Sequence, residues 1–432
     1  FRVSGRLRAF PGSSGRLRMA SFPRHFSALL VTVLERPYSR NGENVTQTAA
    51  VYTDLADSSE AGEHLGAQIV SALGDNVPDA VIVFASSRFD YAALLTAVKE
   101  ECHPTLLVGS SSAGEFTGDS RGEGTACALA LHSKVIRFAA GLGRNVSADR
   151  EAAARQVVSS FQAGDSHDFP YRAALVMTDA LAGHADDLVE QLTLLTSGKY
   201  QFAGGGAGDD ARFERTHVFY GVEAFTDAVV ALEMQSKKPL GVGVGHGWVP
   251  ASDTLRVTEA DGMRLISLNG LPAVEAFEAH ASAGDQSFVR DAPLPFFLHN
   301  ILGIDTGAGH RLRVPLAVHE DGSVTCAAEI PTGARVHIMK ATSASAVTAA
   351  KEATQAAVQK LHGQKPGAAL FFDCVATRLR MGDAFGFEVD TVSDLLGGAD
   401  LVGCNTYGQI ARSEGQFGGF HNCTAVVMVL PE

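Results

Sequence analysis

The sequence predicts an α/β fold with two related halves, each combining parallel strands, crossover helices and antiparallel additions. A recurring strand–helix–strand–glycine turn–strand unit is the first observation behind this prediction. The second is that its strands are continuous apolar runs, which indicates strands covered on both faces. The third is an apolar stripe on the intervening helices, as expected for right-handed crossovers between parallel neighbours.

The recurring unit begins with a buried strand. Its three copies read AVIVFAS at 80–86, AALVMTD at 173–179 and AALFFDC at 368–374. A helical stretch follows each copy, and then a second apolar strand that leads to Gly109, Gly204 or Gly403. We expect the two strands of each copy to lie parallel, with the second strand ending at its glycine.

Each copy continues through a glycine turn. Small residues follow the first glycine, and then come a second glycine and a polar residue: Gly114-Glu115, Gly208-Asp209 and Gly408-Gln409. An apolar strand comes next, which we expect to be antiparallel. Ligands of such sheets favour the crevice beyond the carboxyl ends of the strands, and small residues there let a ligand approach the backbone. The turns therefore predict the rim of a ligand pocket; alternatively, the glycines only make tight turns.

Composition and charge narrow the function classes. Apolar residues make up 46% of the 432 residues, which is ordinary for a globular chain. No window approaches eighteen consecutive apolar residues, so we expect no membrane partner. The net charge is −13, although residues 1–42 hold eight arginines and one acid. The remaining body is strongly acidic and repels phosphate backbones, so we expect no nucleic-acid partner.

The first 45 residues are expected to form a basic, disordered tail. They are rich in arginine, glycine and serine and lack sustained periodicity. Two interpretations are open for the segment: a transit peptide, or translated sequence upstream of a start at Met19.

Metal and cofactor signals are weak. The six cysteines are scattered without a CxxC pair, which argues against a disulfide scaffold and a zinc ribbon and favours the cytoplasm. Residues 206–211 formally match G-x-G-x-x-A, but no helical apolar face follows. The alternating glycines of 241–247 indicate a strand that needs close backbone approach. We predict neither a metal nor a cofactor.

Catalytic arrangements are incomplete, so the residues favour binding over catalysis. The segment Gly109–Ala113 lacks the last glycine of a G-x-S-x-G nucleophile elbow. Cys404 could act as a nucleophile with His421 and Asn422, although a free cysteine at the end of an apolar strand is usually a small core residue. A small-molecule hydrolase or transferase using Cys404 or a serine of 110–112 is the alternative function. A protein-interaction scaffold without a ligand is a third.

One arginine is a candidate carboxylate contact. Arg311 and Arg313 precede Val314-Pro315-Leu316, and arginine binds carboxylates through a two-pronged fork. The alternative role is a surface salt bridge.

Several segments resemble the FIST family in order and spacing. The segment VGSSSAGEF at 108–116 is similar to the small-residue motif of the FIST N-terminal domain. Segments similar to the FIST C-terminal domain are LNGLPAVEAF at 268–277, RVPLAVHEDGSV at 313–324, IPTGARVHIM at 330–339, VGCNTYGQI at 402–410 and FHNCTAVVMVL at 420–430. The resemblance covers about residues 50–432. It implies a FIST N-terminal-like domain at 46–255 and a FIST C-terminal-like domain at 256–432.

The resemblance implies an intracellular sensory module that binds a small polar ligand, such as an amino acid, and signals through a separate protein. Arg313 matches the arginine that the family carries before this strand, so it ranks above Arg311. The usual Cys-Ser-Thr of the first turn is replaced by Ser110–Ser112, which puts the identity of the ligand in doubt. The predicted ligand-binding residues are Gly109, Ser110, Ser111, Ser112, Gly114, Glu115, Arg313, Asn405, Tyr407 and Gly408.

Overall fold

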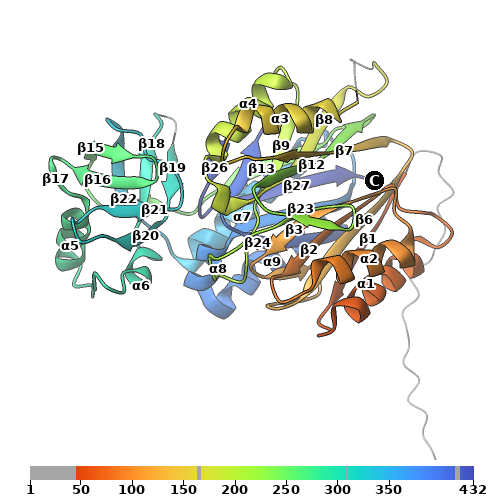
Figure 1. Ribbon diagram of the computed structural model, residues 1–432, viewed down its shortest axis with the longest axis horizontal. Coiled ribbons are helices and arrows are strands. Elements are labelled where there is room, and N and C mark those ends of the chain that lie inside the picture. The colour runs from red at the N-terminus through yellow and green to blue at the C-terminus, as the bar shows by residue number, and fades with distance from the viewer. Residues whose placement is uncertain (1–44, 163–166, 308, 414–418) are drawn as a thin grey trace, which may run out of the picture. The chain divides into compact units, whose positions relative to one another are not determined.

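Three sheets, each with helices on its outer face, correspond to the three copies of the recurring unit (Figure 1). The computed structural model describes residues 45–162, 167–307, 309–413 and 419–432, and 43–432 form one unit. The tail predicted at 1–45 lies outside the described residues, except for Val45. Mixed parallel and antiparallel sheets with crossover helices confirm the predicted α/β fold class.

The first unit spans residues 46–133. Its elements are β1 (Thr46–Thr53), α1 (Ser58–Leu73), β2 (Ala80–Ser86), α2 (Tyr91–Cys102), β3 (Leu106–Ser112), β4 (Glu115–Thr117), β5 (Arg121–Gly122) and β6 (Ala126–Ser133). Helix α1 begins where Asp57 accepts hydrogen bonds from the backbone N–H groups of Ser59 and Glu60, a typical N-cap. Strands β2 and β3 are parallel, and β6 pairs antiparallel with β2, as predicted.

The second unit repeats this order between residues 136 and 236. Its elements are β7 (Ile136–Arg144), α3 (Arg150–Ser159), β8 (Tyr171–Thr178), the 3₁₀ turn η1 (Ala180–Ala182), α4 (Ala185–Leu195), β9 (Gln201–Gly206), β10 (Val218–Tyr220), β11 (Glu223–Phe225) and β12 (Ala228–Ser236). Strands β8 and β9 are parallel, and β12 is antiparallel to β8.

The third unit is interrupted by an insert. Its elements are β13 (Gly241–Gly245), α7 (Ser343–Gln359), β23 (Pro366–Cys374), α8 (Val375–Met381), η2 (Gly382–Phe385), α9 (Gly386–Leu396), β24 (Asp400–Thr406), β25 (Gln409–Arg412), β26 (Gly419–His421) and β27 (Ala425–Pro431). Strands β23 and β24 are parallel, which completes the predicted threefold pattern. The glycines of β13 confirm the predicted close approach, since a Cβ at Gly241 would lie 2.0 Å from the carbonyl oxygen of Ala357 in α7.

The insert, between β13 and α7, forms a nine-stranded antiparallel sheet. It contains β14 (Val249–Pro250), β15 (Leu255–Asp261), β16 (Arg264–Leu268), β17 (Leu271–Pro272), α5 (Ala273–Ala283), α6 (Leu294–Phe297), β18 (Ile301–Asp305), β19 (His310–Arg313), β20 (Pro315–Val318), β21 (Val324–Cys326) and β22 (Arg335–Lys340). Phe277, Phe297 and Leu302 pack in its own apolar core.

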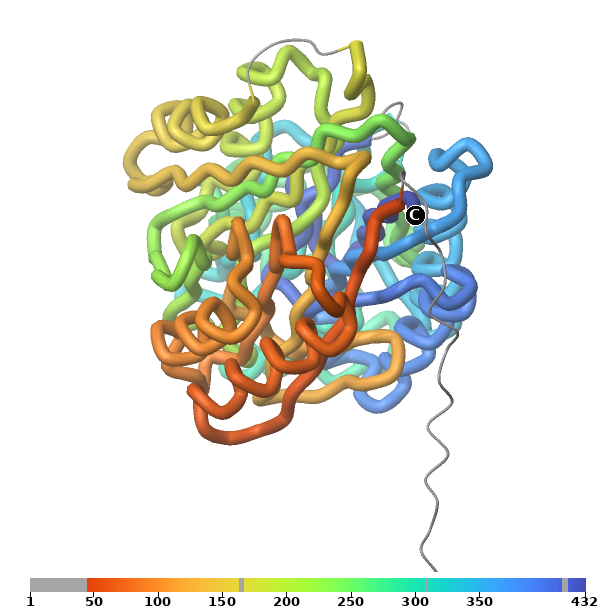
Figure 2. The backbone as a smooth tube through the Cα atoms, turned by 90° about the vertical axis from the view of Figure 1, so that its right-hand side faces the viewer, coloured from red at the N-terminus to blue at the C-terminus, as the bar shows by residue number. Residues whose placement is uncertain are grey.

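The three sheets exchange hairpins in a cycle, which the sequence did not predict. Hairpin β4–β5 of the first unit completes the third sheet, β10–β11 of the second unit completes the first, and β25–β26 of the third unit completes the second. Figure 2 shows the first unit in red to orange, the second in yellow to green and the third in blue, in three sectors around one centre. The glycine turns precede these hairpins, so each turn crosses from one sheet to the next.

One apolar core lies between the three sheets. Alternation along each strand sends one set of side chains inward, such as Ile82, Leu175 and Leu370. The other set packs under the outer helices; Val81 and Val83, for example, contact the cluster of α1 and α2. Burying a side chain of this size stabilises the fold by roughly 1.5–3 kcal/mol relative to exposure. This shared core fixes the position of the three glycine turns.

The first glycine of each copy lies within a strand, not at its end as predicted. Gly109 pairs with Val83, and β3 continues to Ser112. A Cβ at Gly109 would lie 1.8 Å from the carbonyl oxygen of Val83, and the φ angle of Gly109 is +155°. Glycine is therefore required here by the close approach of two parallel strands and not by a turn.

Candidate functional site

The three glycine turns form a ring closed by backbone hydrogen bonds. We define the first turn as residues 110–115, the second as 205–209 and the third as 404–409. Asn405 donates to the carbonyl oxygen of Gly114 at 2.8 Å and joins the third turn to the first. Gly206 donates to Gly408 at 2.9 Å, and Gly208 donates to Ser111 at 3.0 Å, which closes the ring. The backbone groups that make these three bonds are occupied by one another, so the side chains of the turns are the better candidates for further contacts.

The serines of the first turn are fully buried in this ring. The hydroxyl of Ser111 accepts from the backbone N–H of His217 at 2.9 Å, and the hydroxyl of Ser112 donates to Glu115 at 2.6 Å. The hydroxyl of Ser110 has no partner among the described residues. None of the three lines the charged cavity beside this turn.

Glu115 is a buried acid at the end of the first turn. One carboxylate oxygen accepts from Ser112, and the other accepts from the N–H and hydroxyl of Thr125 at 3.1 and 2.8 Å. Burial raises the pKa of Glu115 to about 7; the hydroxyl groups of Ser112 and Thr125 lower it, and the charge of Asp210 raises it further. Glu115 therefore titrates close to neutral pH.

A charged cavity of about 540 Å³ opens beside Glu115, within the size range of small-molecule sites. Its wall comes from the β4–β5 hairpin, the third turn and the segment from α8 to α9. The lining residues are Glu115, Phe116, Arg121, Gly122, Glu123, Arg378, Leu379, Gly382, Asp383, Phe385, Gly386 and Asn405.

Two unpartnered side chains face each other in this cavity. Asn405 is 1% exposed, and neither its amide nitrogen nor its oxygen has a partner among the described residues. The Nε of Arg378 is likewise buried and without a partner within that part of the chain. A Cβ at Gly114 would lie 2.8 Å from the Asn405 oxygen and 3.3 Å from this Nε. Gly114 thus leaves open the space in which Asn405 and Arg378 converge.

The other end of the Arg378 guanidinium is held by an exposed acid. Its Nη1 forms an ion pair with Glu123, whose side chain is 74% exposed. Burial lowers the pKa of Arg378, while the nearby charge of Glu115 acts in the opposite direction. Glu123 thus pairs with one end of the guanidinium, while the Nε at the other end has no partner among the described residues.

Tyr407 and Gly408 lie on the opposite side of the third turn, at a separate apolar cavity of about 160 Å³. The Tyr407 hydroxyl forms a hydrogen bond with Asp209, and its ring stacks on Phe213 at 4.3 Å between centroids. Five of the predicted ligand-binding residues therefore lie at one or the other of two cavities. Glu115 and Asn405 line the charged one, with Gly114 against it, while Tyr407 and Gly408 line the apolar one.

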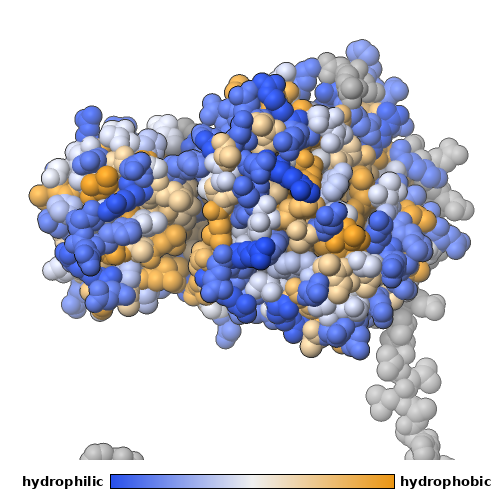
Figure 3. Space-filling view, in the orientation of Figure 1, coloured by the Kyte–Doolittle hydropathy of each residue, from blue (hydrophilic) through white to orange (hydrophobic). Residues whose placement is uncertain are grey.

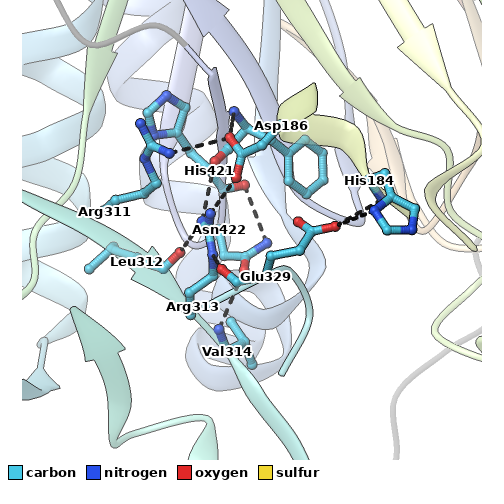
Figure 4. Close-up of polar contacts among 10 residues, drawn as sticks. His184, Asp186, Arg311, Leu312, Arg313, Val314, Glu329, His421 and Asn422 are labelled. Carbon is cyan, nitrogen blue, oxygen red and sulfur yellow. Dashed lines mark hydrogen bonds and ion pairs between the residues drawn. The ribbon is translucent and has the colours of Figure 1, made fainter. Parts of the chain in front are cut away.

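Arg313 is held by protein groups in a different place (Figure 4). Its side chain is 1% exposed, and it donates to Asp186 at 2.5 Å and to the carbonyl oxygens of Glu329, Leu312 and Phe420. This arrangement joins the insert to α4 and β26. These contacts indicate a structural role for Arg313 in place of the predicted contact with a ligand carboxylate. The ion pair with Asp186 is also not the surface salt bridge of the alternative prediction, because Arg313 is buried.

The thiol of Cys404 is poorly suited to nucleophilic chemistry. Cys404 is fully buried, and burial raises the pKa of its thiol well above the usual value. His421 has its pKa lowered to about 4 by burial and by Arg311 and Arg313. Within the residues described, no three His, Cys, Asp or Glu side chains are grouped to hold a metal ion.

Arg378 is the site residue that the sequence reasoning missed. It lies in VATRLRM, directly after the strand that ends at Cys374. The rule that sites lie beyond the carboxyl ends of parallel strands could have found it, had it been applied to the first strand of each unit as well as to the glycine turns.

Two comparisons with known proteins give no information about function. A search of curated proteins found no match to this chain. Among solved structures, a cyanuric acid hydrolase from A. caulinodans aligns over 90% of this chain and all of its own, with 8% identity and a TM-score of 0.32. A likeness this weak carries no argument about function. Separately, no helix in the described part of the chain is long and apolar enough to cross a membrane.

Family models match most of the chain. The FIST N domain matches residues 79–271, and the FIST C domain matches residues 273–412. FIST domains are of the sensory and signal-transduction kind. The chain belongs to the FIST family, with a FIST N domain followed by a FIST C domain.

Proposed function

We propose that this protein is a sensory module that binds a small amino acid or a related carboxylate in the charged cavity. The observation that carries the proposal is the pair of buried, unpartnered groups on Arg378 and Asn405, which converge on one space. Buried polar groups normally have partners, so groups left without one are candidates for ligand contacts.

The chemistry of the two side chains fits an amino acid. A guanidinium binds a carboxylate through two parallel N–H donors, and on Arg378 the edge formed by Nε and Nη2 would supply them, because Glu123 is paired with Nη1 and the Nε has no partner among the described residues. The amide of Asn405 supplies one donor group and one acceptor. Its oxygen would accept from the ammonium group of the ligand while its nitrogen donates to the carboxylate.

Glu123 would stay on Nη1 when the ligand binds, away from the Nε edge of the guanidinium. Its side chain is largely exposed, so this ion pair is weak. A ligand carboxylate at the buried Nε would be less solvated and more strongly held. A separate signalling protein would then read the bound state, as expected from the family resemblance.

The test is a thermal-shift screen and calorimetry with the twenty amino acids, each compared with the amine that lacks its carboxylate. A ligand at one hundred times its dissociation constant should stabilise the protein by about 2.7 kcal/mol. We expect the matching amine to give no shift. Arg378→Met should weaken binding by about 100-fold, the value of a lost charged contact.

The control is Arg155→Met, which removes an exposed arginine of α3 that pairs with Glu151. It should bind as the parent does. Unchanged binding by Arg378→Met would contradict the proposed site. If no amino acid or related carboxylate shifts the melting temperature, a scaffold without a ligand becomes the better interpretation.

A further inference from the structure

The apolar cavity on the other side of the third turn has cysteine in its wall. It lies between the insert and the second and third units, and Val314, Leu316, Val375 and Tyr407 supply much of its apolar surface. Figure 3 shows hydrophobic residues along the junction between the insert, on the left, and the three sheets. Cys374 and Cys326 both line this cavity. A small apolar molecule that enters it therefore meets two thiols.

Only one of these thiols has a second cysteine beside it. Cys374 ends β23, and Cys423 lies just before β27, the antiparallel neighbour of β23. The two side chains are hydrogen-bonded to each other, and both are buried in one cluster with Trp248. A disulfide requires two sulfur atoms that can approach to about 2 Å, and a direct hydrogen bond between two thiols already places the sulfur atoms next to each other. The two side chains are therefore close enough for a disulfide to form with a small movement.

The two thiols, Cys374 and Cys423, differ in acidity. The hydrogen bond from Cys423 lowers the pKa of Cys374 to about 7 against the opposing effect of burial, and the pKa of Cys423 is raised well above its usual value. Cys374 is thus the acceptor and Cys423 the donor. Burial raises the pKa of Cys326 to about 12, so that thiol stays neutral in the same cavity. Thiolates and not thiols are nucleophiles, which singles out Cys374.

We propose that Cys374 is a peroxide-reactive cysteine that small organic hydroperoxides reach through the apolar cavity, and that Cys423 resolves it as a disulfide. The Cys374 thiolate attacks the outer peroxide oxygen, the O–O bond breaks, and the departing alkoxide takes a proton to become an alcohol. Sulfur is oxidised to a sulfenic acid while the peroxide is reduced. Oxidation of Cys374 removes the thiolate whose hydrogen bond is the largest cause of the raised pKa of Cys423, so Cys423 can lose its proton. The Cys423 thiolate attacks the sulfur of Cys374, an S–S bond forms, and the departing hydroxide takes a proton to become water.

The full-length, reduced protein is treated with cumene hydroperoxide and mapped by peptide mass spectrometry. We expect a Cys374–Cys423 crosslink in the parent. Cys423→Ser should instead accumulate a dimedone-reactive sulfenic acid on Cys374, because the resolving thiol is gone. Cys326→Ser, the matched control in the same cavity, should form the crosslink at the parental rate. Hydrogen peroxide at equal concentration should react more slowly, because it gains nothing from the apolar wall.

A second measurement needs no variant. The rate at which N-ethylmaleimide labels each cysteine of the folded parent is followed from pH 5.5 to 9. Cys374 should be labelled with a midpoint near pH 7, and Cys326 should stay unlabelled. The proposal is overturned if the folded parent forms no Cys374–Cys423 crosslink, or if Cys374 is labelled no faster than Cys326. The proposal is also overturned if cumene hydroperoxide oxidises the Cys374→Ser variant to the same extent as the parent protein.

Discussion

The first and third glycine turns make equivalent contacts but differ in charge, since an acid stands in the first turn and a neutral amide in the third. Glu115 bonds to the hydroxyl of Ser112 and to the backbone N–H of Thr125. Gln409 makes the equivalent contacts, donating to the Thr406 hydroxyl at 2.9 Å and accepting from the N–H of Thr424 at 3.2 Å. A neutral amide thus satisfies the same contacts. The turn therefore needs a side chain that can bridge these groups, and it does not need that side chain to be an acid.

The spaces beside these turns differ accordingly. The first turn faces Arg378 in a charged cavity, while the third turn presents Tyr407 to an apolar one. Directly after the second turn, the carboxylate of Asp210 accepts hydrogen bonds from the hydroxyl and the N–H of Ser87. Three similar junctions have therefore acquired different chemistry through side chains alone, which is how one repeated unit can support several functions.

The largest loss of stability should come from replacing the first glycine of a unit, because in all three units this glycine lies against the backbone of the neighbouring parallel strand. Gly109→Ala places a Cβ 1.8 Å from the carbonyl oxygen of Val83, between two strands that the core holds in place. We expect a loss of more than about 4 kcal/mol, which is a large fraction of the roughly 5–15 kcal/mol by which folded domains are stable. The measurement is soluble yield followed by urea unfolding. Gly74→Ala, whose Cβ would meet nothing within 4 Å, is the control and should cost much less despite its φ of +61°. Comparable losses in both variants would contradict the close-approach argument.

The next effect separates two arginines, of which Arg313 is buried and Arg378 is partly exposed. Arg313→Met leaves Asp186 with a weaker partner and removes the donors of three backbone carbonyls, so we expect a loss of about 3–5 kcal/mol. Arg378→Met removes a side chain with fewer protein contacts, so it should cost less than about 1 kcal/mol of stability while weakening ligand binding by about 100-fold. Urea unfolding of both variants checks the difference. If the Arg313→Met variant is as stable as the parent, the structural role is wrong and Arg313 is again a candidate ligand contact.

The sequence predicted the local elements because their signals are local. Apolar runs and capping residues such as Asp57 identify strands and helix starts without knowledge of the fold. The threefold repeat then specified which strands are parallel. The cyclic exchange of hairpins could not be predicted in this way, because each hairpin pairs with a strand of another unit and its own sequence does not name that strand.

Site residues were predicted only where they belong to a repeated motif. Glu115 and Asn405 stand in the glycine turns, so the search reached them, and the ring brings them to one cavity. Arg313 shows the limit, since its partner Asp186 is 127 residues away and nothing in either segment indicates the pairing. Arg378 looks like part of an ordinary polar helix face until the fold places it opposite Asn405.

A smaller effect should follow from giving the third turn the charge of the first. Gln409 is fully buried, and the side chain of Thr406 and the backbone of Thr424 that bond to its amide are neutral. Gln409→Glu would bury a carboxyl group there without a guanidinium like that of Arg378 beside it. We expect a loss of about 3 kcal/mol at pH 8 that shrinks towards pH 5, where the carboxyl is protonated. Urea unfolding at both pH values measures it. A loss independent of pH would show that shape, and not charge, distinguishes the two turns.

The smallest effect is the reverse exchange. Glu115→Gln should fold, because Gln409 shows that an amide satisfies the equivalent turn. The pKa of Glu115 is raised from its usual value of 4.5 to about 7 in the folded protein. Its contribution to stability is therefore fully present below pH 4.5 and is lost as the pH rises to 7, because the unfolded chain releases this proton first. The variant has no such proton to lose.

The difference in unfolding free energy between Glu115→Gln and the parent should therefore grow in favour of the variant from pH 5 to pH 7 and then level off. The total change should be about 2 kcal/mol, which urea unfolding resolves. The acid also lies close to Arg378, so its ionisation should oppose a bound carboxylate. Affinity for an amino acid should thus fall with rising pH across this range in the parent and stay level in Glu115→Gln. If stability follows this course but affinity does not, Glu115 is a buried acid of the turn alone. If neither changes with pH, the carboxyl is not protonated near neutrality, and the charge that distinguishes the first turn from the third has no energetic consequence.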